Sequence, residues 1–200
     1  MKKIMLSAIT CLLLTTGMDA QRKELAITFS GLNSFGFSYR AGNDAALWRF
    51  NTVLGLANSS KRTYDSLENS SSSTQIRLAA GREWRKPINE KLTFRYGLDL
   101  RGSFRKNYSE YKDMRNVPFP NNRLSEDIVY GAGTNLVLGF NYQFSPNFLA
   151  GLEFLPSYTY YFGNGRNSSN NQVVASYDIQ EWTTDINLNA ILLSLVYVFD

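Results

Sequence analysis

The chain of 200 residues contains no histidine and a single cysteine, Cys11. The lack of histidine excludes a Ser-His-Asp triad, a histidine-aided protease or acyltransferase, and histidine metal sites. Cys11 lies in an apolar N-terminal run, and the rest of the chain contains no cysteine. The rest of the chain therefore has neither a disulfide nor thiol chemistry. The sequence also contains no phosphate-binding loop and no nucleic-acid motif. We therefore predict no catalytic residue, cofactor or metal ion, and we do not expect an enzyme.

The first 20 residues have the three-part pattern of a secretory signal peptide. Two lysines are followed by the mostly apolar segment Ile4–Leu14, which is too short to span a bilayer as a helix, and then by the small, polar segment Thr15–Ala20. We predict cleavage after Ala20, which leaves residues 21–200 as one domain. That domain keeps 19 basic and 16 acidic residues of the 21 and 17 in the whole chain. Such a mild net charge does not indicate a nucleic-acid partner.

Alternation of apolar and polar residues is the dominant pattern after the leader, and the segment Lys91–Arg105 has it most clearly. One parity of this segment is apolar, with Leu92, Phe94, Tyr96, Leu98 and Leu100. The other parity carries Arg95, Asp99 and Arg101. Successive side chains of a strand point to opposite faces, so the segment predicts a strand with one apolar and one charged face.

The same pattern predicts eight strands, and the connections between them are alternately short and long. The expected strands are 24–30, 34–41, 45–57, 74–86, 91–106, 127–144, 148–162 and 181–199. Turn residues at 40–44, 86–90 and 145–147 predict short turns, and the polar stretches 58–74, 106–127 and 163–172 predict long loops. All short turns then share one side of the sheet, and all long loops share the other.

Three irregularities are expected within this scheme. A bend or tight turn near Gly31 keeps the strand count even. Pro156 lacks a backbone donor and predicts a bulge or local break in strand 148–162. In strand 181–199 the apolar parity changes, which predicts a bulge near Asn189.

Aromatic residues gather at the two ends of the expected strands. Rings that sit at lipid headgroups form such girdles on either side of an aliphatic band. The alternative is that the rings lie in the core of a soluble barrel. The predicted lipid-facing girdle residues are Trp48, Trp84, Tyr142, Phe144, Tyr158, Tyr160, Tyr197 and Phe199.

With its leader, alternating strands, unequal connections and final strand, the chain resembles the small eight-stranded bacterial outer-membrane β-barrel family over about residues 24–200. The last strand ends Leu195-Val196-Tyr197-Val198-Phe199, similar to the terminal aromatic signal of that family, although Asp200 follows it here. The resemblance implies an all-β, up-and-down antiparallel transmembrane barrel in the bacterial outer membrane. It also implies two kinds of partner, outer-membrane lipid and the barrel-assembly machinery.

The polar parity predicts the interior of the barrel. Because eight strands enclose a space that side chains roughly fill, its acids are expected to pair with its arginines and to plug it. The predicted inward polar cluster is Arg77, Glu83, Arg95, Asp99, Arg101 and Glu153. A narrow polar path, a small ligand pocket, or acid–base work by Glu83 and Asp99 are the alternatives.

The predicted role is structural work or surface interaction through the long outer loops, with a ligand that the sequence does not identify. A narrow channel for small or amphipathic solutes is the second hypothesis. The third is a soluble secreted barrel that binds a ligand inside. The third requires an apolar interior, which the arginine-rich parity argues against.

Overall fold

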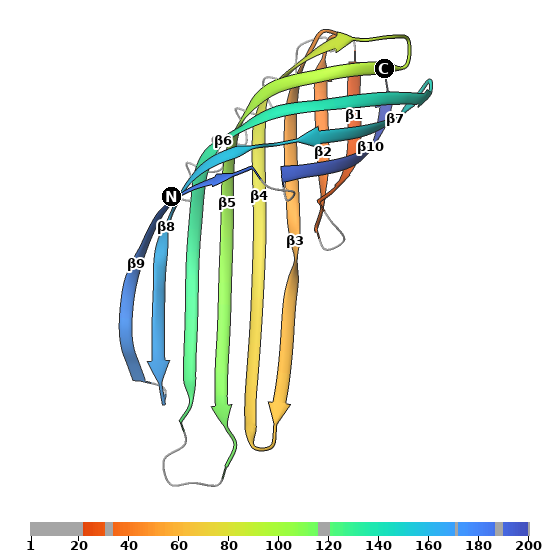
Figure 1. Ribbon diagram of the computed structural model, residues 1–200. Helices are drawn as coiled ribbons and strands as arrows, with labels where there is room; N and C mark the ends of the chain where they lie inside the picture. Colours follow the sequence, from red (N-terminus) through yellow and green to blue (C-terminus); the bar gives the residue numbers. More distant parts are fainter. Residues whose placement is uncertain (1–21, 31–33, 116–120, 171, 187–189, 200) are drawn as a thin grey trace.

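The computed structural model describes residues 22–30, 34–115, 121–170, 172–186 and 190–199, so the predicted signal peptide lies outside the described residues. Antiparallel strands make up almost all of these ranges (Figure 1). The strands are β1 (Arg22–Phe29), β2 (Ser34–Gly42), β3 (Ala46–Tyr64), β4 (Leu67–Pro87), β5 (Leu92–Asp113), β6 (Arg123–Ser145), β7 (Phe148–Phe154), β8 (Ser157–Ser169), β9 (Gln172–Asp185) and β10 (Ile191–Phe199). None of the described segments is a helix of the length and hydropathy needed to cross a membrane.

Eight of the described strands close into a barrel, in the order β1-β2-β3-β4-β5-β6-β7-β10. The β5–β6 pairing completes the run of hairpins, and the antiparallel β1–β10 pairing joins the first strand to the last. Leu25 lies opposite Tyr197, and Lys23 lies opposite Phe199 in that closing pair. The predicted up-and-down antiparallel barrel is confirmed.

The barrel is inverted relative to a soluble fold, because its apolar parity faces outward. On β5, Leu98 and Leu100 are 49% and 69% exposed, whereas Arg95 and Asp99 are fully buried. Leu136 and Leu138 of the neighbouring strand β6 are exposed in the same way. The exterior is therefore a hydrocarbon surface and the interior is charged.

The prediction of long loops at 58–74, 106–127 and 163–172 is wrong, because most of these residues belong to β-strands. Beyond the closed barrel, six strands form an open sheet in the order β3-β4-β5-β6-β8-β9, the lower part of Figure 1. We call this sheet the extension, and it comprises residues 59–64, 67–74, 106–113, 123–127, 163–169 and 172–181. Serine, asparagine and charged residues occupy both of its faces, so it lacks the alternation that marks a membrane strand.

The expected break at Pro156 separates β7 from β8, and the two strands pair with different parts of β6. Residues 138–145 of β6 pair with β7, whereas residues 123–135 pair with β8. The predicted strand 181–199 is likewise divided between β9 and β10, and the bulge expected near Asn189 falls outside the described residues. β1 and β2 flank the turn expected near Gly31, which also lies outside them.

Candidate functional site: the charged lumen

Eight charged side chains meet inside the closed barrel, and we call them the luminal network. Each has less than 5% of its side chain exposed. The members are Glu24 of β1, Arg40 of β2, Arg49 of β3, Glu83 and Arg85 of β4, Arg95 and Asp99 of β5, and Glu153 of β7. Four arginines face four carboxylates, so the network is neutral when all members are charged.

Glu153 is the centre of the network. Its Oε1 atom lies 2.6 Å from Nη2 of Arg40 and 3.0 Å from Nη2 of Arg95. Its Oε2 atom accepts a 2.7 Å hydrogen bond from Nη2 of Arg49. Strands from three parts of the barrel wall are therefore tied to a single carboxylate on β7.

Glu83 extends these contacts on the opposite wall. Its Oε2 atom lies 3.0 Å from Nη1 of Arg49 and 3.2 Å from Nη1 of Arg95. Nε of Arg85 donates to its Oε1 atom at 2.8 Å. Asp99 joins the network through Nε of Arg49, 3.2 Å from its Oδ1 atom. Buried charges of both signs are thus held close together, as desolvated ions require.

Two glycines make room for Arg95. A Cβ atom built on Gly139 or on Gly151 would lie 3.4 Å from Nη2 of Arg95, and it would come closer still to atoms of the adjoining strands, the Leu152 carbonyl oxygen and Oγ of Ser194 respectively. The missing side chains on β6 and β7 therefore leave the space that the guanidinium occupies. Small residues placed beside long arginines allow the lumen to be filled.

The structure brings four of the predicted inward residues together, namely Glu83, Arg95, Asp99 and Glu153. Arg77 and Arg101 lie apart from the network, and Nη1 of Arg101 donates to Oγ of Ser157 at 2.7 Å. The predicted cluster left out Arg49 and Arg85 of the network, and it also missed Glu24 and Arg40 of the first hairpin. The alternation in the first hairpin could have found them, because both lie on the parity opposite its outward aromatic residues.

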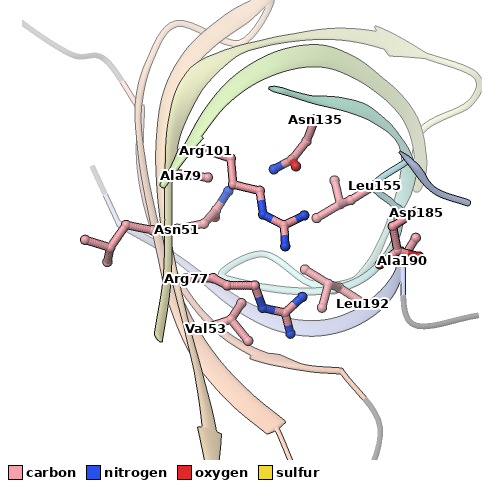
Figure 2. A pocket seen from close by; sticks show the side chains of 11 residues that line it. Asn51, Val53, Arg77, Ala79, Arg101, Asn135, Leu155, Asp185, Ala190 and Leu192 are labelled. Carbon is pink, nitrogen blue, oxygen red and sulfur yellow. The ribbon is translucent and has the colours of Figure 1, made fainter. Parts of the chain in front are cut away.

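Cavities lie on both sides of the luminal network. The one near the extension has a volume of about 50 Å³ and is bordered by Asn51, Arg77, Arg101, Asn135 and Asp185 together with apolar side chains (Figure 2). The one near the short turns has a volume of about 260 Å³, and Arg85 of the network forms part of its wall. The two cavities share no lining residue. Within the described ranges, no group of three His, Cys, Asp or Glu side chains is arranged to hold a metal ion.

Stacked rings surround the outside of the barrel at two levels. Near the short turns, Phe148 packs against Phe144 and Tyr197, with ring centroids 6.2 and 5.2 Å apart. Near the extension, Trp182 packs against Tyr158 and Tyr160, at 5.1 and 4.5 Å. The remaining predicted girdle residues, Trp48, Trp84, Tyr142 and Phe199, lie on the level near the short turns. Trp84 stacks on Tyr96, and Phe199 stacks on Tyr197. The guanidinium of Arg82 covers the Trp48 ring, and Tyr142 is half exposed.

Ion pairs also connect strands of the extension. Glu126 of β6 lies 2.7 Å from Nζ of Lys106 on β5 and 2.5 Å from Nη2 of Arg166 on β8. The hydrogen bonds from Lys106 and Arg166 lower the pKa of the Glu126 carboxyl. One carboxylate thus links three consecutive strands outside the barrel.

A closed antiparallel barrel with an apolar exterior, two aromatic girdles and a charged interior defines a class, the transmembrane β-barrel of the bacterial outer-membrane type. Solved structures similar to this chain include a major outer membrane protein from Thermus thermophilus, with 10% identity, a TM-score of 0.45, and coverage of 88% of this chain and 99% of that one. CarO of Acinetobacter baumannii has 9% identity, a TM-score of 0.38, and coverage of 90% and 97%.

A third similar structure is Ail, the attachment invasion locus protein of Yersinia pestis, with 14% identity, a TM-score of 0.31, and coverage of 89% of this chain and 94% of that one. No protein-family model and no curated sequence matches the chain. The class follows from the chain's own burial pattern and closed strand order.

Proposed function

We propose that the protein is a non-enzymatic barrel of the outer membrane that works through its extension, in surface interaction or in a structural role. The observation that carries the proposal is the convergence of Arg40, Arg49 and Arg95 on Glu153, which fills the lumen with paired side chains. A lumen held by charge-balanced pairs supports an anchor better than a path for solutes. The hydrogen-bonded extension, polar on both faces, then provides the surface available to a partner.

Planar-bilayer recordings test the closed lumen. We expect the wild-type protein to give no stepwise ionic current, because ions would have to displace buried ion pairs. The double variant Arg49→Ala/Glu153→Ala removes one cation and one anion together and should introduce current steps. Leu136→Ala on the exterior is the matched control and should behave like the wild type. Regular current steps from the wild-type protein would contradict the proposal and favour a narrow channel.

The role of the extension is tested by shortening it. Replacing residues 60–71 with Asn-Gly connects the opposed residues Ser59 and Ser72 through a two-residue hairpin turn. We expect the shortened barrel to assemble normally, as measured by its heat-modifiable gel migration. Cell–cell aggregation should fall if the role is interaction, and detergent sensitivity should rise if it is structural. Unchanged values of both measurements would contradict a role for the extension.

A further inference from the structure

Three arginines near the mouth of the barrel differ from the luminal network in having few acidic partners. Arg101 and Arg105 lie on the same face of β5, and Ser103 between them is paired with Arg77 of β4. Arg77 is therefore the diagonal neighbour of both, within reach of long side chains. The three guanidinium groups are placed over one small area of the inner wall.

The surroundings of these arginines are neutral or apolar. Besides Arg77 and Arg101, the lining of the 50 Å³ cavity includes Asn51, Asn135, Leu155 and Leu192, and Asp185 is its one carboxylate among the described residues. Arg105 stands one layer further out, 5.6 Å from the centre of the Tyr161 ring. Three positive charges thus share one nearby carboxylate, whereas the luminal network below them is balanced.

The available contacts leave the guanidinium groups incompletely satisfied. Arg77 and Arg101 repel each other electrostatically, and Asp185 attracts Arg77. Nη1 of Arg101 donates to Ser157, but the buried Nε atoms of Arg77, Arg101 and Arg105 have no hydrogen-bond partner in the structure. Buried donors without acceptors are costly, and like charges in a poorly hydrated site increase that cost.

Space for an acceptor exists next to these donors. Figure 2 shows the side chains of Arg77 and Arg101 reaching into the space that the strands enclose. Gly131 and Gly133 of β6 pair with Ser103 and Arg101 and contribute no side chain to the site, and the side chains of Tyr161 and Thr159 on β8 lie against them. A volume of 50 Å³ exceeds the roughly 10–15 Å³ that one water requires.

We propose that Arg77, Arg101 and Arg105 form a binding site for a phosphate group at the mouth of the barrel. Arginine presents planar, forked donors that fit phosphate oxygens, and a multiply charged anion offsets the excess of positive charge. Free phosphate and the phosphorylated headgroup of a membrane lipid both carry such a group. The site is separate from the luminal network and does not depend on the role of the extension.

The test uses the full chain in detergent micelles or nanodiscs, at constant ionic strength. Inorganic phosphate is titrated in one arm, against sodium chloride, and binding is followed by ³¹P NMR line broadening and by the thermal unfolding midpoint. In the other arm, nanodiscs containing phosphatidic acid are compared with nanodiscs of phosphatidylcholine alone. A response in the first arm identifies free phosphate as a ligand, and a response limited to the second identifies a lipid headgroup.

Arg77→Gln and Arg101→Gln should each weaken the response at least tenfold, whereas Arg62→Gln, which removes the same charge in the exposed extension, should leave it unchanged. Neither glutamine variant removes a member of the luminal network, and heat-modifiable migration verifies that each barrel is folded. Arg101→Lys retains the charge without the fork and should bind with intermediate strength. The absence of a response in both arms, or an equal response in all variants, would overturn the proposal.

Discussion

Arg85 holds Glu24 with both of its terminal nitrogens, since Nη1 lies 2.6 Å from Oε1 and Nη2 lies 2.7 Å from Oε2. The two residues belong to β4 and β1, which are separated by two strands in the barrel wall. This fork therefore crosses the lumen and connects walls that share no backbone hydrogen bonds. Charge-assisted hydrogen bonds of this kind are about twice as strong as neutral ones, and the bidentate fork also fixes the geometry of the pair.

Glu24→Gln should lower the free energy of unfolding by about 3–5 kcal/mol, because it removes one buried negative charge and leaves Arg85 and Arg40 to share the remaining carboxylates, Glu83 and Glu153. The measurement is the folded fraction on heat-modifiable gels across a urea titration. Glu68→Gln is the matched control, since its partner Lys61 is exposed and the effect should stay within about 1 kcal/mol. Equal urea midpoints for the two variants would contradict a buried network.

Leu100→Arg should destabilise the barrel by about 2–4 kcal/mol if the side chain lies near the bilayer midplane. Leu100 is 69% exposed on the exterior of β5, where lipid rather than water is expected. Ser109→Arg is the control, because it adds the same side chain to an exposed position of the extension on the same strand. Unfolding in lipid vesicles measures both variants, and a neutral Leu100→Arg would mean that this face is solvated.

Acid should loosen the extension. The pKa of Glu126 is below the ordinary carboxyl value of 4.5, so its ion pairs stabilise the folded state above that value. This stabilisation is lost as the pH falls through the lower, folded-state pKa. Hydrogen exchange of β5, β6 and β8 amides outside the barrel should therefore accelerate in acid. Glu126→Gln should show fast exchange at neutral pH with little further change, and an unchanged exchange profile would contradict the assignment.

Phe199→Ala should reduce assembly more than it reduces the stability of barrels already inserted. Phe199 stacks on Tyr197 at the end of β10, the strand that closes the barrel against β1, and closure must occur before lipid surrounds an open edge. The folded fraction in outer-membrane preparations measures assembly. Phe162→Ala, at the other aromatic level, is the control. Normal assembly of Phe199→Ala would indicate that the barrel-assembly machinery does not read this residue.

The barrel could be predicted from sequence because a single rule determines it. Lipid outside and paired charges inside force strict alternation, as Leu98, Asp99 and Leu100 illustrate. The extension could not be predicted in this way. Water contacts both faces of segments such as Ser70–Thr74, so no face has to be apolar, and the polar composition resembles that of a loop.

Alternation along a strand shows which face of the sheet a side chain lies on, but it does not show which side chain it pairs with. Arg95 and Arg101 share a face of β5, yet Arg95 reaches Glu83 and Glu153 whereas Arg101 reaches Ser157. The difference arises from their height along the tilted strands and from which residues on other strands lie at the same level. These depend on the stagger of the barrel, which a single sequence does not reveal.

The continuity of β3 to β6 from the barrel into the extension affects how the chain tolerates insertions and deletions. Opposed residues beside a hairpin turn, such as Thr63 and Glu68, can be removed as a pair without changing the register of the pairs below them. Removing one residue from a single strand would instead turn every later side chain of that strand to the other face. The outer sheet can therefore grow or shrink by whole pairs while the membrane-facing surface stays the same.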